Sequence, residues 1–201
     1  MIIVITGSLL FISLIIYLIS KRIRSAREKK INSAYDLNKQ GLVFLNGGNY
    51  KEAGRYFESA IELHPLEFTF YYNAGIAAAH LENYEESIRL FRKALYLKPD
   101  LFDAYLNIGV IYFGRNQLNN AKINLDTALG LNPRSEKAHF FLGKVYKKED
   151  NLQNAVKHFI KTTDINPKNL AAHLFLGEIY LQTENFDLAE ERFKILAEFY
   201  N

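Results

Sequence analysis

The sequence predicts an all-α protein, an α-solenoid of five 34-residue helix-turn-helix repeats preceded by one transmembrane helix. Two observations support this fold class: a 34-residue period shared by four series of residues, and an uncharged apolar stretch at the N-terminus. With 201 residues, the chain is long enough for one well-packed domain and an appendage. It contains no cysteine, which excludes disulfides, Cys-ligated zinc and thiol catalysis.

The apolar stretch covers residues 2–19, IIVITGSLLFISLIIYLI, and carries no charged side chain. As a helix it would span about 27 Å, close to the roughly 30 Å thickness of a bilayer's hydrocarbon core. A cleaved signal peptide would need basic residues before the apolar core and a small-residue cleavage site after it. Only Met1 precedes the core, and no A-x-A pattern follows it. We therefore predict an uncleaved anchor over residues 1–19, with the lipid bilayer as its partner.

Basic residues are concentrated directly after this stretch, in SKRIRSAREKK at residues 20–30. This segment has six basic and one acidic residue; subtracting them from totals of 25 and 22 leaves 19 basic and 21 acidic residues elsewhere. Positive charge marks the cytoplasmic end of a transmembrane helix, so we predict an outside N-terminus and cytoplasmic repeats, at a bacterial inner membrane. Without a basic surplus in the repeats, no nucleic-acid partner is expected. The membrane-flanking residues are Lys21, Arg22, Arg24, Arg27, Lys29 and Lys30.

Four series of residues recur with the same period. Prolines stand at 65, 99, 133 and 167, and glycines at 41, 75, 109, 143 and 177. Small residues recur at 53, 87, 121, 155 and 189, and large apolar residues at 57, 91, 125, 159 and 193. A register shared by four series indicates a repeat array. The expected repeats are 34–67, 68–101, 102–135, 136–169 and 170–201, after a basic juxtamembrane segment at 20–33.

Each repeat divides into two helices joined by a polar turn. In the third repeat, apolar residues follow helical spacing over residues 102–113 and again over 119–131. Proline ends the second helix one or two residues before it. The glycine should let the two helices approach closely, with the small and the large apolar residue facing it from the second helix. Residues 20–33 contain neither Gly nor Pro, so an unbroken helix is expected from the anchor into the first repeat.

The repeat resembles the tetratricopeptide repeat family over residues 34–201. That family carries a large residue at place 4, Leu-Gly at 7–8, Tyr at 11, Ala at 20, Phe at 24, Ala at 27 and Pro at 32. Place 4 here holds Leu37, Tyr71, Tyr105, His139 and His173. Place 11 holds Phe44, Ala78, Tyr112, Tyr146 and Tyr180. The resemblance implies a right-handed α-solenoid that binds another protein, as a helix or peptide segment, in a concave groove lined by the first helices.

The family's groove-lining places identify the candidate partner-binding residues. They are Tyr72, Asn73, Ile76, Leu106, Asn107, Val110, Phe113, Phe140, Phe141, Lys144, Lys147, Lys148, Leu174 and Phe175. The alternative is that the apolar members of this set pack between neighbouring helices. One subset of the family clamps the C-terminal carboxylate of heat-shock chaperones. Asn73 and Asn107 match its middle place, but Asn38, Leu42 and Asp103 stand at other clamp places, so chaperone docking of that kind is not expected.

No motif of a phosphate-binding loop, zinc protease or serine hydrolase occurs. His139 and His173 occupy the large-residue place of their repeats, which favours packing over metal binding. His64, His80 and His158 are expected in turns or facing solvent. The sequence therefore predicts no enzyme, no metal, no cofactor and no small-molecule substrate.

The leading hypothesis is a membrane-anchored adaptor or scaffold that binds a partner protein at the cytoplasmic face. The alternative is a structural subunit of an envelope machine, such as a secretion system, pilus or flagellar motor. It would assemble as an oligomer through an uncapped last repeat, where Ile195, Phe199 and Tyr200 are expected at an open edge. A third possibility is regulation of an enzyme partner.

Overall fold

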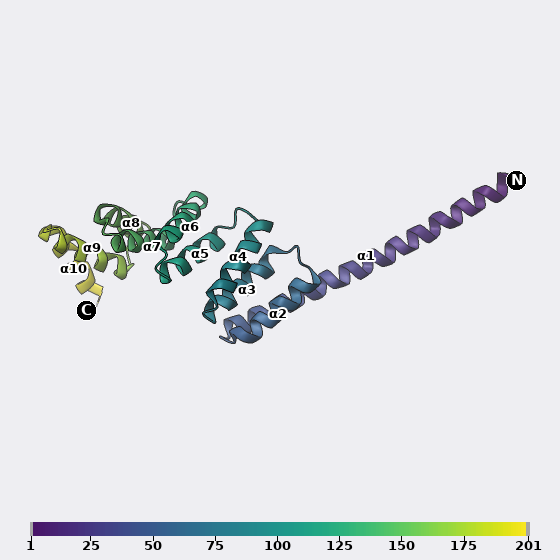
Figure 1. Ribbon diagram of the computed structural model, residues 1–201, viewed down its shortest axis with the longest axis horizontal. Helices are drawn as coiled ribbons and strands as arrows, with labels where there is room; N and C mark the ends of the chain where they lie inside the picture. Colours follow the sequence, from purple (N-terminus) through teal and green to yellow (C-terminus); the bar gives the residue numbers. More distant parts are fainter. Residues whose placement is uncertain (1, 200–201) are drawn as a thin grey trace. The chain divides into compact units, whose positions relative to one another are not determined.

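The computed structural model describes residues 2–199, and their side chains from residue 13 onward (Figure 1). Over this range the chain is all α-helical, without strands, and comprises two compact units, Met1–Leu97 (unit 1) and Lys98–Asn201 (unit 2). Unit 1 contains α1 Ile2–Asn46, α2 Tyr50–Leu63, α3 Phe68–His80 and α4 Tyr84–Leu97. Unit 2 contains α5 Phe102–Gly114, α6 Leu118–Leu131, α7 Glu136–Lys148, α8 Leu152–Ile165, α9 Leu170–Gln182 and α10 Phe186–Phe199.

Consecutive helices pair into hairpins, α1 with α2, α3 with α4, α5 with α6, α7 with α8 and α9 with α10. This confirms the predicted helix-turn-helix repeat. The second helices end at Leu63, Leu97, Leu131 and Ile165, each two residues before a proline, as predicted. Polar side chains cap several N-termini; the Ser135 hydroxyl, for example, accepts a hydrogen bond of 3.1 Å from the Ala138 N–H.

Each hairpin turn places one residue in the left-handed region of the backbone. These residues recur with the 34-residue period, and their φ angles are 77° at Gly48, 59° at Glu82, 58° at Asn116, 55° at Asp150 and 58° at Glu184. A left-handed residue after the helix end lets the following N–H groups bond to the last free carbonyls. The Asn83 N–H, for example, donates to the Ala78 carbonyl at 3.0 Å. The turn is therefore set by backbone hydrogen bonding rather than by glycine alone.

The periodic glycines are close-approach sites, as predicted. A Cβ atom built on Gly143 would lie 2.7 Å from the Phe159 ring, and one on Gly75 would lie 2.8 Å from Phe91. The small residue of the series also faces its glycine: the Ser87 hydroxyl donates to the Gly75 carbonyl at 2.8 Å. Within each hairpin, the large residue of the second helix thus fills the space that the missing side chain leaves open.

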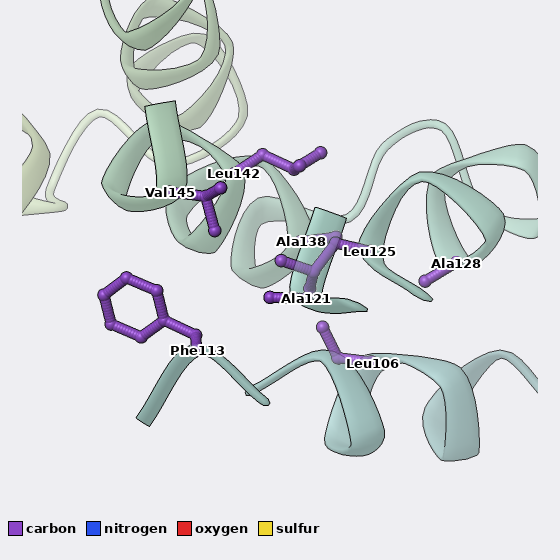
Figure 2. Packing of buried hydrophobic residues seen from close by; sticks show 8 residues of the cluster. All are labelled: Leu106, Phe113, Ala121, Leu125, Ala128, Ala138, Leu142 and Val145. Carbon is purple, nitrogen blue, oxygen red and sulfur yellow. The ribbon is translucent and has the colours of Figure 1, made fainter. Parts of the chain in front are cut away.

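The core of unit 2 lies between successive hairpins (Figure 2). Its central cluster joins α5, α6 and α7, and its buried members are Leu106, Phe113, Ala121, Leu125, Ala128, Ala138, Leu142 and Val145. A second cluster joins α8, α9 and α10 around Phe159 and Leu176, both fully buried. These clusters hold the first helices α5, α7 and α9 in a fixed register, which positions the side chains described below.

Helix α1 continues without a break through the basic segment, which confirms the expected single helix (Figure 1). Only its C-terminal part packs on α2 and α3, where Ala34 is fully buried and the Tyr35 hydroxyl donates to a Glu67 carboxylate oxygen at 2.5 Å. Residues 13–30 are exposed. With about 100° of rotation per residue, the six basic side chains point to all sides of the helix.

No helix within the described part of the chain is both long and apolar enough to cross a membrane. The side chains of residues 1–12, which form most of the expected anchor, lie outside that part. The anchor therefore stays a prediction from the sequence.

Candidate functional site

Unit 2 gathers most of the predicted partner-binding residues on its first helices. Four phenylalanines from α5, α7 and α9 lie beside three lysines of α7. We call this set the Phe–Lys cluster; its members are Phe113, Phe140, Phe141, Phe175, Lys144, Lys147 and Lys148. The α7 members recur at spacings of three and four residues, which places them on one face of the helix.

The phenylalanines form a continuous row of rings. The centroid of Phe141 lies 5.7 Å from that of Phe113 and 5.8 Å from that of Phe140. The Phe140 ring in turn lies 5.9 Å from Phe175, which stacks on the buried Phe159 at 5.1 Å. Edge-to-face and offset pairs at these separations are favourable beyond the area that they bury. The row therefore links three successive first helices by side-chain contacts.

The lysines lie over these rings. The Lys144 Nζ is 4.7 Å from the centroid of Phe113 and 5.1 Å from that of Phe141. The Lys148 Nζ is 4.9 Å from Phe113, and the Lys147 Nζ is 4.7 Å from Phe175. Ammonium groups within about 6 Å of a ring centroid are attracted by the ring's negative face. The cluster therefore has two layers: a layer of apolar rings, and a layer of positively charged ammonium groups that covers them.

The three ammonium groups differ in their polar partners. Lys147 pairs with the Glu178 carboxylate of α9, and Lys148 donates to the Asn116 side-chain oxygen at 3.2 Å. Within residues 13–199, Lys144 has no carboxylate partner. Burial lowers the pKa of the Lys144 ammonium, and the nearby charge of Lys148 lowers it further. A carboxylate placed beside Lys144 would therefore compensate a charge that the protein itself leaves unpaired.

Other predicted residues of unit 2 differ in how much surface they offer. Leu106 is 6% exposed and belongs to the core cluster, so its role is packing rather than contact with a partner. Val110 packs partly buried against the same cluster, and Asn107 is also partly buried. Leu174, by contrast, is 42% exposed on α9. The alternative of interhelical packing thus holds for part of the predicted set.

The three predicted residues of unit 1 lie on α3. Asn73 donates from its side-chain amide to the Asn38 side-chain oxygen at 2.9 Å, so it joins α3 to α1. The Tyr72 ring lies 5.6 Å from Phe91, and Ile76 is partly buried. All three are partly buried.

A pair of histidines that the sequence did not connect joins α7 to α8. The Nδ1 atoms of His139 and His158 lie 3.1 Å apart, and the His139 Nε2 lies 3.1 Å from the Pro133 carbonyl oxygen. A carbonyl can only accept, so the His139 Nε2–H donates to it. A neutral His139 then accepts at Nδ1 from the His158 N–H. The expectation that His158 faces solvent is wrong, because its ring stacks on Tyr146 at 5.4 Å and is half-buried.

Repeat equivalence explains the His139 contact. Tyr71 and His173 occupy the same place as His139 in their repeats and make the same bond. The Tyr71 hydroxyl donates to the Pro65 carbonyl at 3.1 Å, and the His173 Nε2–H donates to the Pro167 carbonyl at 3.1 Å. The place-4 side chain thus ties the first helix to the proline turn before it. This agrees with the packing role predicted for both histidines.

We expect the histidine pair to make folding stability depend on pH between about 6.5 and 4. Burial lowers the pKa of His158 to about 4, with further contributions from the charges of His139 and Lys157. Burial also lowers the pKa of His139, although its bond to Pro133 opposes this. The unfolded state therefore binds protons in this window before the folded state does, so stability falls as the pH falls. Melting temperatures measured across the window report this slope.

The chain offers a matched control for this slope, because the equivalent residues of unit 1 are Tyr71 and Leu90. A double variant His139→Tyr, His158→Leu copies that pair and should flatten the slope relative to the unchanged protein, while the shared carboxylates titrate equally in both. An equal slope in both proteins would assign the pH dependence to other groups.

Three family models, each described as a tetratricopeptide repeat, match residues 38–102, 102–135 and 146–200. The chain is built from tetratricopeptide repeats. Such repeats mediate protein–protein interaction, and none of the three models describes a catalytic family. A comparison with curated protein sequences found no match.

Solved structures of tetratricopeptide repeat proteins have a similar fold. A fragment of MamA from Desulfovibrio magneticus RS-1, residue 41 to the end, is 25% identical with a TM-score of 0.75, covering 82% of this chain and 94% of that one. YrrB, described as a tetratricopeptide repeat protein with an unusual peptide-binding site, is 25% identical with a TM-score of 0.69, covering 86% and 89%. The pilF protein of Pseudomonas aeruginosa is 18% identical with a TM-score of 0.75, covering 86% and 78%, and this likeness concerns the fold alone.

Proposed function

We propose that the protein is an interaction scaffold whose Phe–Lys cluster binds a segment of a partner protein. The observation that carries this proposal is Lys144, a partly buried ammonium held over phenylalanine rings without a carboxylate partner of its own. Partly buried rings beside an ammonium group without a carboxylate partner fit a segment that brings both apolar and acidic side chains. The peptide-binding site described for YrrB supports this use of the fold.

The partner's chemistry follows from the two layers of the cluster. Apolar side chains of the partner would pack against Phe141 and Phe175, both partly buried by their neighbours. A carboxylate would lie beside Lys144, and a second one could compete with Glu178 for Lys147. Charge complementarity of this kind sets the register and the rate of association more than its strength, so the rings should supply most of the affinity.

We expect Phe141→Glu and Phe175→Glu each to reduce recovery of the native partner by about tenfold or more, since each buries a new charge and removes a ring. The measurement is affinity purification of the full-length chain from detergent-solubilised membranes, with quantification of the co-purified protein. Ile123→Glu on α6 is the matched control, because Ile123 is 63% exposed and lies outside the cluster.

Lys148→Glu should weaken recovery less and make it less sensitive to salt, because Lys148 is exposed and already bonded to Asn116. Circular dichroism of each variant separates loss of binding from loss of folding. A partner retained by folded Phe141→Glu and Phe175→Glu proteins would refute the assignment of this surface.

We also propose that residues 2–19 anchor the chain in a membrane, with the N-terminus outside and the repeats in the cytoplasm. Support comes from the uncharged sequence of this stretch and from the basic side chains that follow it on the same helix and point to all sides of it. Basic groups on all sides suit a helix that passes through a layer of anionic headgroups better than one that lies flat on it. The scaffold would then recruit its partner to the cytoplasmic membrane face.

The topology can be measured with reporters fused after Asn201. We expect a reporter that functions only in the cytoplasm to be active, and alkaline phosphatase, which functions only outside it, to be inactive. Reversing the charges at Arg22, Arg24 and Arg27 should lower the fraction of molecules that have their C-terminus in the cytoplasm. An active phosphatase fusion of the unchanged protein would contradict the proposed orientation.

The second candidate function is assembly through the last hairpin. Exposed apolar side chains on α9 and α10 favour it, with Phe186 63%, Leu181 48% and Phe199 47% exposed. The predicted edge residue Tyr200 lies outside the described residues, and Ile195 is partly buried. A strictly monomeric full-length protein in detergent, measured by light scattering at high concentration, would exclude this function. An oligomer that dissociates into monomers in the Phe199→Glu variant would support assembly through the last hairpin.

A further inference from the structure

The ring at place 11 of the fourth repeat fills the space between two successive second helices. Tyr146 on α7 stacks on His158 of α8, with centroids 5.4 Å apart and planes at 20°. The Lys122 Nζ of α6 also lies over this ring, 5.4 Å from the Tyr146 centroid. Lys122 itself is held by the Glu149 carboxylate at 2.8 Å. The Tyr146 ring thus contacts both a cation of α6 and a second ring of α8.

The same three places hold small or aliphatic residues two repeats earlier. Ala78 stands where the fourth repeat has Tyr146, Gly54 stands in place of Lys122, and Leu90 stands in place of His158. At this position the structure has a cleft of about 260 Å³ between α2, α3 and α4, all within unit 1. A Cβ atom added to Gly54 would meet nothing within 4 Å, so the space next to Gly54 on α2 is open.

The cleft has an apolar floor and a charged rim. Its floor consists of Ala74, Ala77, Ala78 and Leu90, and its rim includes Lys51, Arg55, Glu58 and Glu86. Arg55 and Glu86 already pair with residues of their own helices, Glu52 and Arg89 respectively. The rim therefore offers both hydrogen-bond donors and acceptors without an excess of either charge.

We propose that this cleft binds one tyrosine side chain of a partner protein. An apolar cavity of about 150 Å³ holds a benzene ring, so the cleft has room for a phenol. Its floor is the surface left by a missing tyrosine of the repeat, and its polar rim suits a hydroxyl group at the edge of an apolar ring. The site lies in unit 1, between α2, α3 and α4, whereas the Phe–Lys cluster lies on the first helices of unit 2. The two sites are therefore independent.

The test uses the full-length chain in detergent, labelled with ¹³C at the alanine methyl groups, and N-acetyltyrosinamide as the probe. Ring-current shifts are expected at the methyl groups of Ala74, Ala77 and Ala78 and at no other alanines. N-acetylleucinamide, the aliphatic comparison, should bind at least about fivefold more weakly. Shifts spread over alanines of both units, or equal binding of the two amides, would overturn the proposal.

Two variants fill the cleft from opposite sides. Ala78→Tyr restores the tyrosine of the repeat, and Gly54→Leu enters from α2; each should reduce probe affinity by about tenfold or more. Gly130→Leu on α6 is the matched control, since a Cβ there also meets nothing within 4 Å and the site lies outside the cleft. If Ala78→Tyr does not fold, Gly54→Leu decides the outcome. Unchanged binding in a folded cleft-filling variant would refute the site.

Discussion

Replacement of Phe159 by alanine is expected to destabilise unit 2 by about 3–5 kcal/mol, the usual loss for a fully buried aromatic ring in a packed core. Phe159 has no exposed surface, stacks on Phe175 at 5.1 Å and contacts Phe140 at 5.9 Å. It also lies directly against Gly143, where an added Cβ atom would come within 2.7 Å of the Phe159 ring. Its removal would leave a cavity shared by α7, α8 and α9.

The loss should be local, because the stability of a repeat protein depends on each repeat and on its interfaces with its neighbours. Amide hydrogen exchange should therefore rise in α7 to α10, while α1 to α3 stay protected. Phe159→Leu is the matched control, since Leu125 fills this place in the third repeat, and its cost should be clearly smaller. Equal protection of α7 to α10 in Phe159→Ala and in the unchanged protein would contradict this account of the core.

Ala26→Pro is expected to break α1 in its exposed basic segment. Proline in a helix interior removes one hydrogen bond and clashes with the preceding turn, at a cost of about 3 kcal/mol. Residues 20–30 make no packing contact that could offset this cost, because they are exposed on all sides. Several basic residues also lie three apart, and such like-charge pairs weaken a helix further.

Spin labels make this break measurable. The chain has no cysteine, so Ser13→Cys and Ser33→Cys supply the only labelling sites. An unbroken helix separates them by about 30 Å. Pulsed electron paramagnetic resonance should give a narrow distribution near that distance for the unchanged helix and for Ala26→Gln. Ala26→Pro should give a shorter and broader one. A broad distribution in the unchanged helix would show that α1 is not rigid in solution.

Features set by the local backbone, or recurring with the repeat period, could be predicted from the sequence. The ends of α2, α4, α6 and α8 follow from the proline two residues later, and the close approach of paired helices follows from a glycine opposite Phe159 or its counterparts. The continuity of α1 followed from the lack of Gly and Pro in residues 20–33. Proline, and the lack of Gly and Pro, act on the local backbone, whereas the glycine contact could be predicted because its two residues recur in register with the repeat.

Features that depend on side chains from separate helices could not be predicted in this way. Leu106 occupies a groove-lining place of the family, but the α6 and α7 side chains around it bury it in the core. His158 pairs with His139 only because α7 and α8 lie side by side. The position of Lys144 over three phenylalanine rings likewise requires the actual spacing of α5 and α7. The departure at Ala78 was visible in the sequence, but the cleft also needs Gly54 on another helix.

Because α1 is unbroken, the length of its exposed segment also determines the direction in which the first hairpin points around the helix axis. Each residue inserted between Ile19 and Ala34 would move the first hairpin by about 1.5 Å along the helix axis and turn it by about 100° around that axis. Substitutions in this segment change its charge, whereas insertions and deletions rotate the first hairpin around the helix axis. If a partner had to contact a membrane and the first hairpin at the same time, many residue types would be compatible with its binding. Only those segment lengths that leave the hairpin facing the same direction around the helix axis would be.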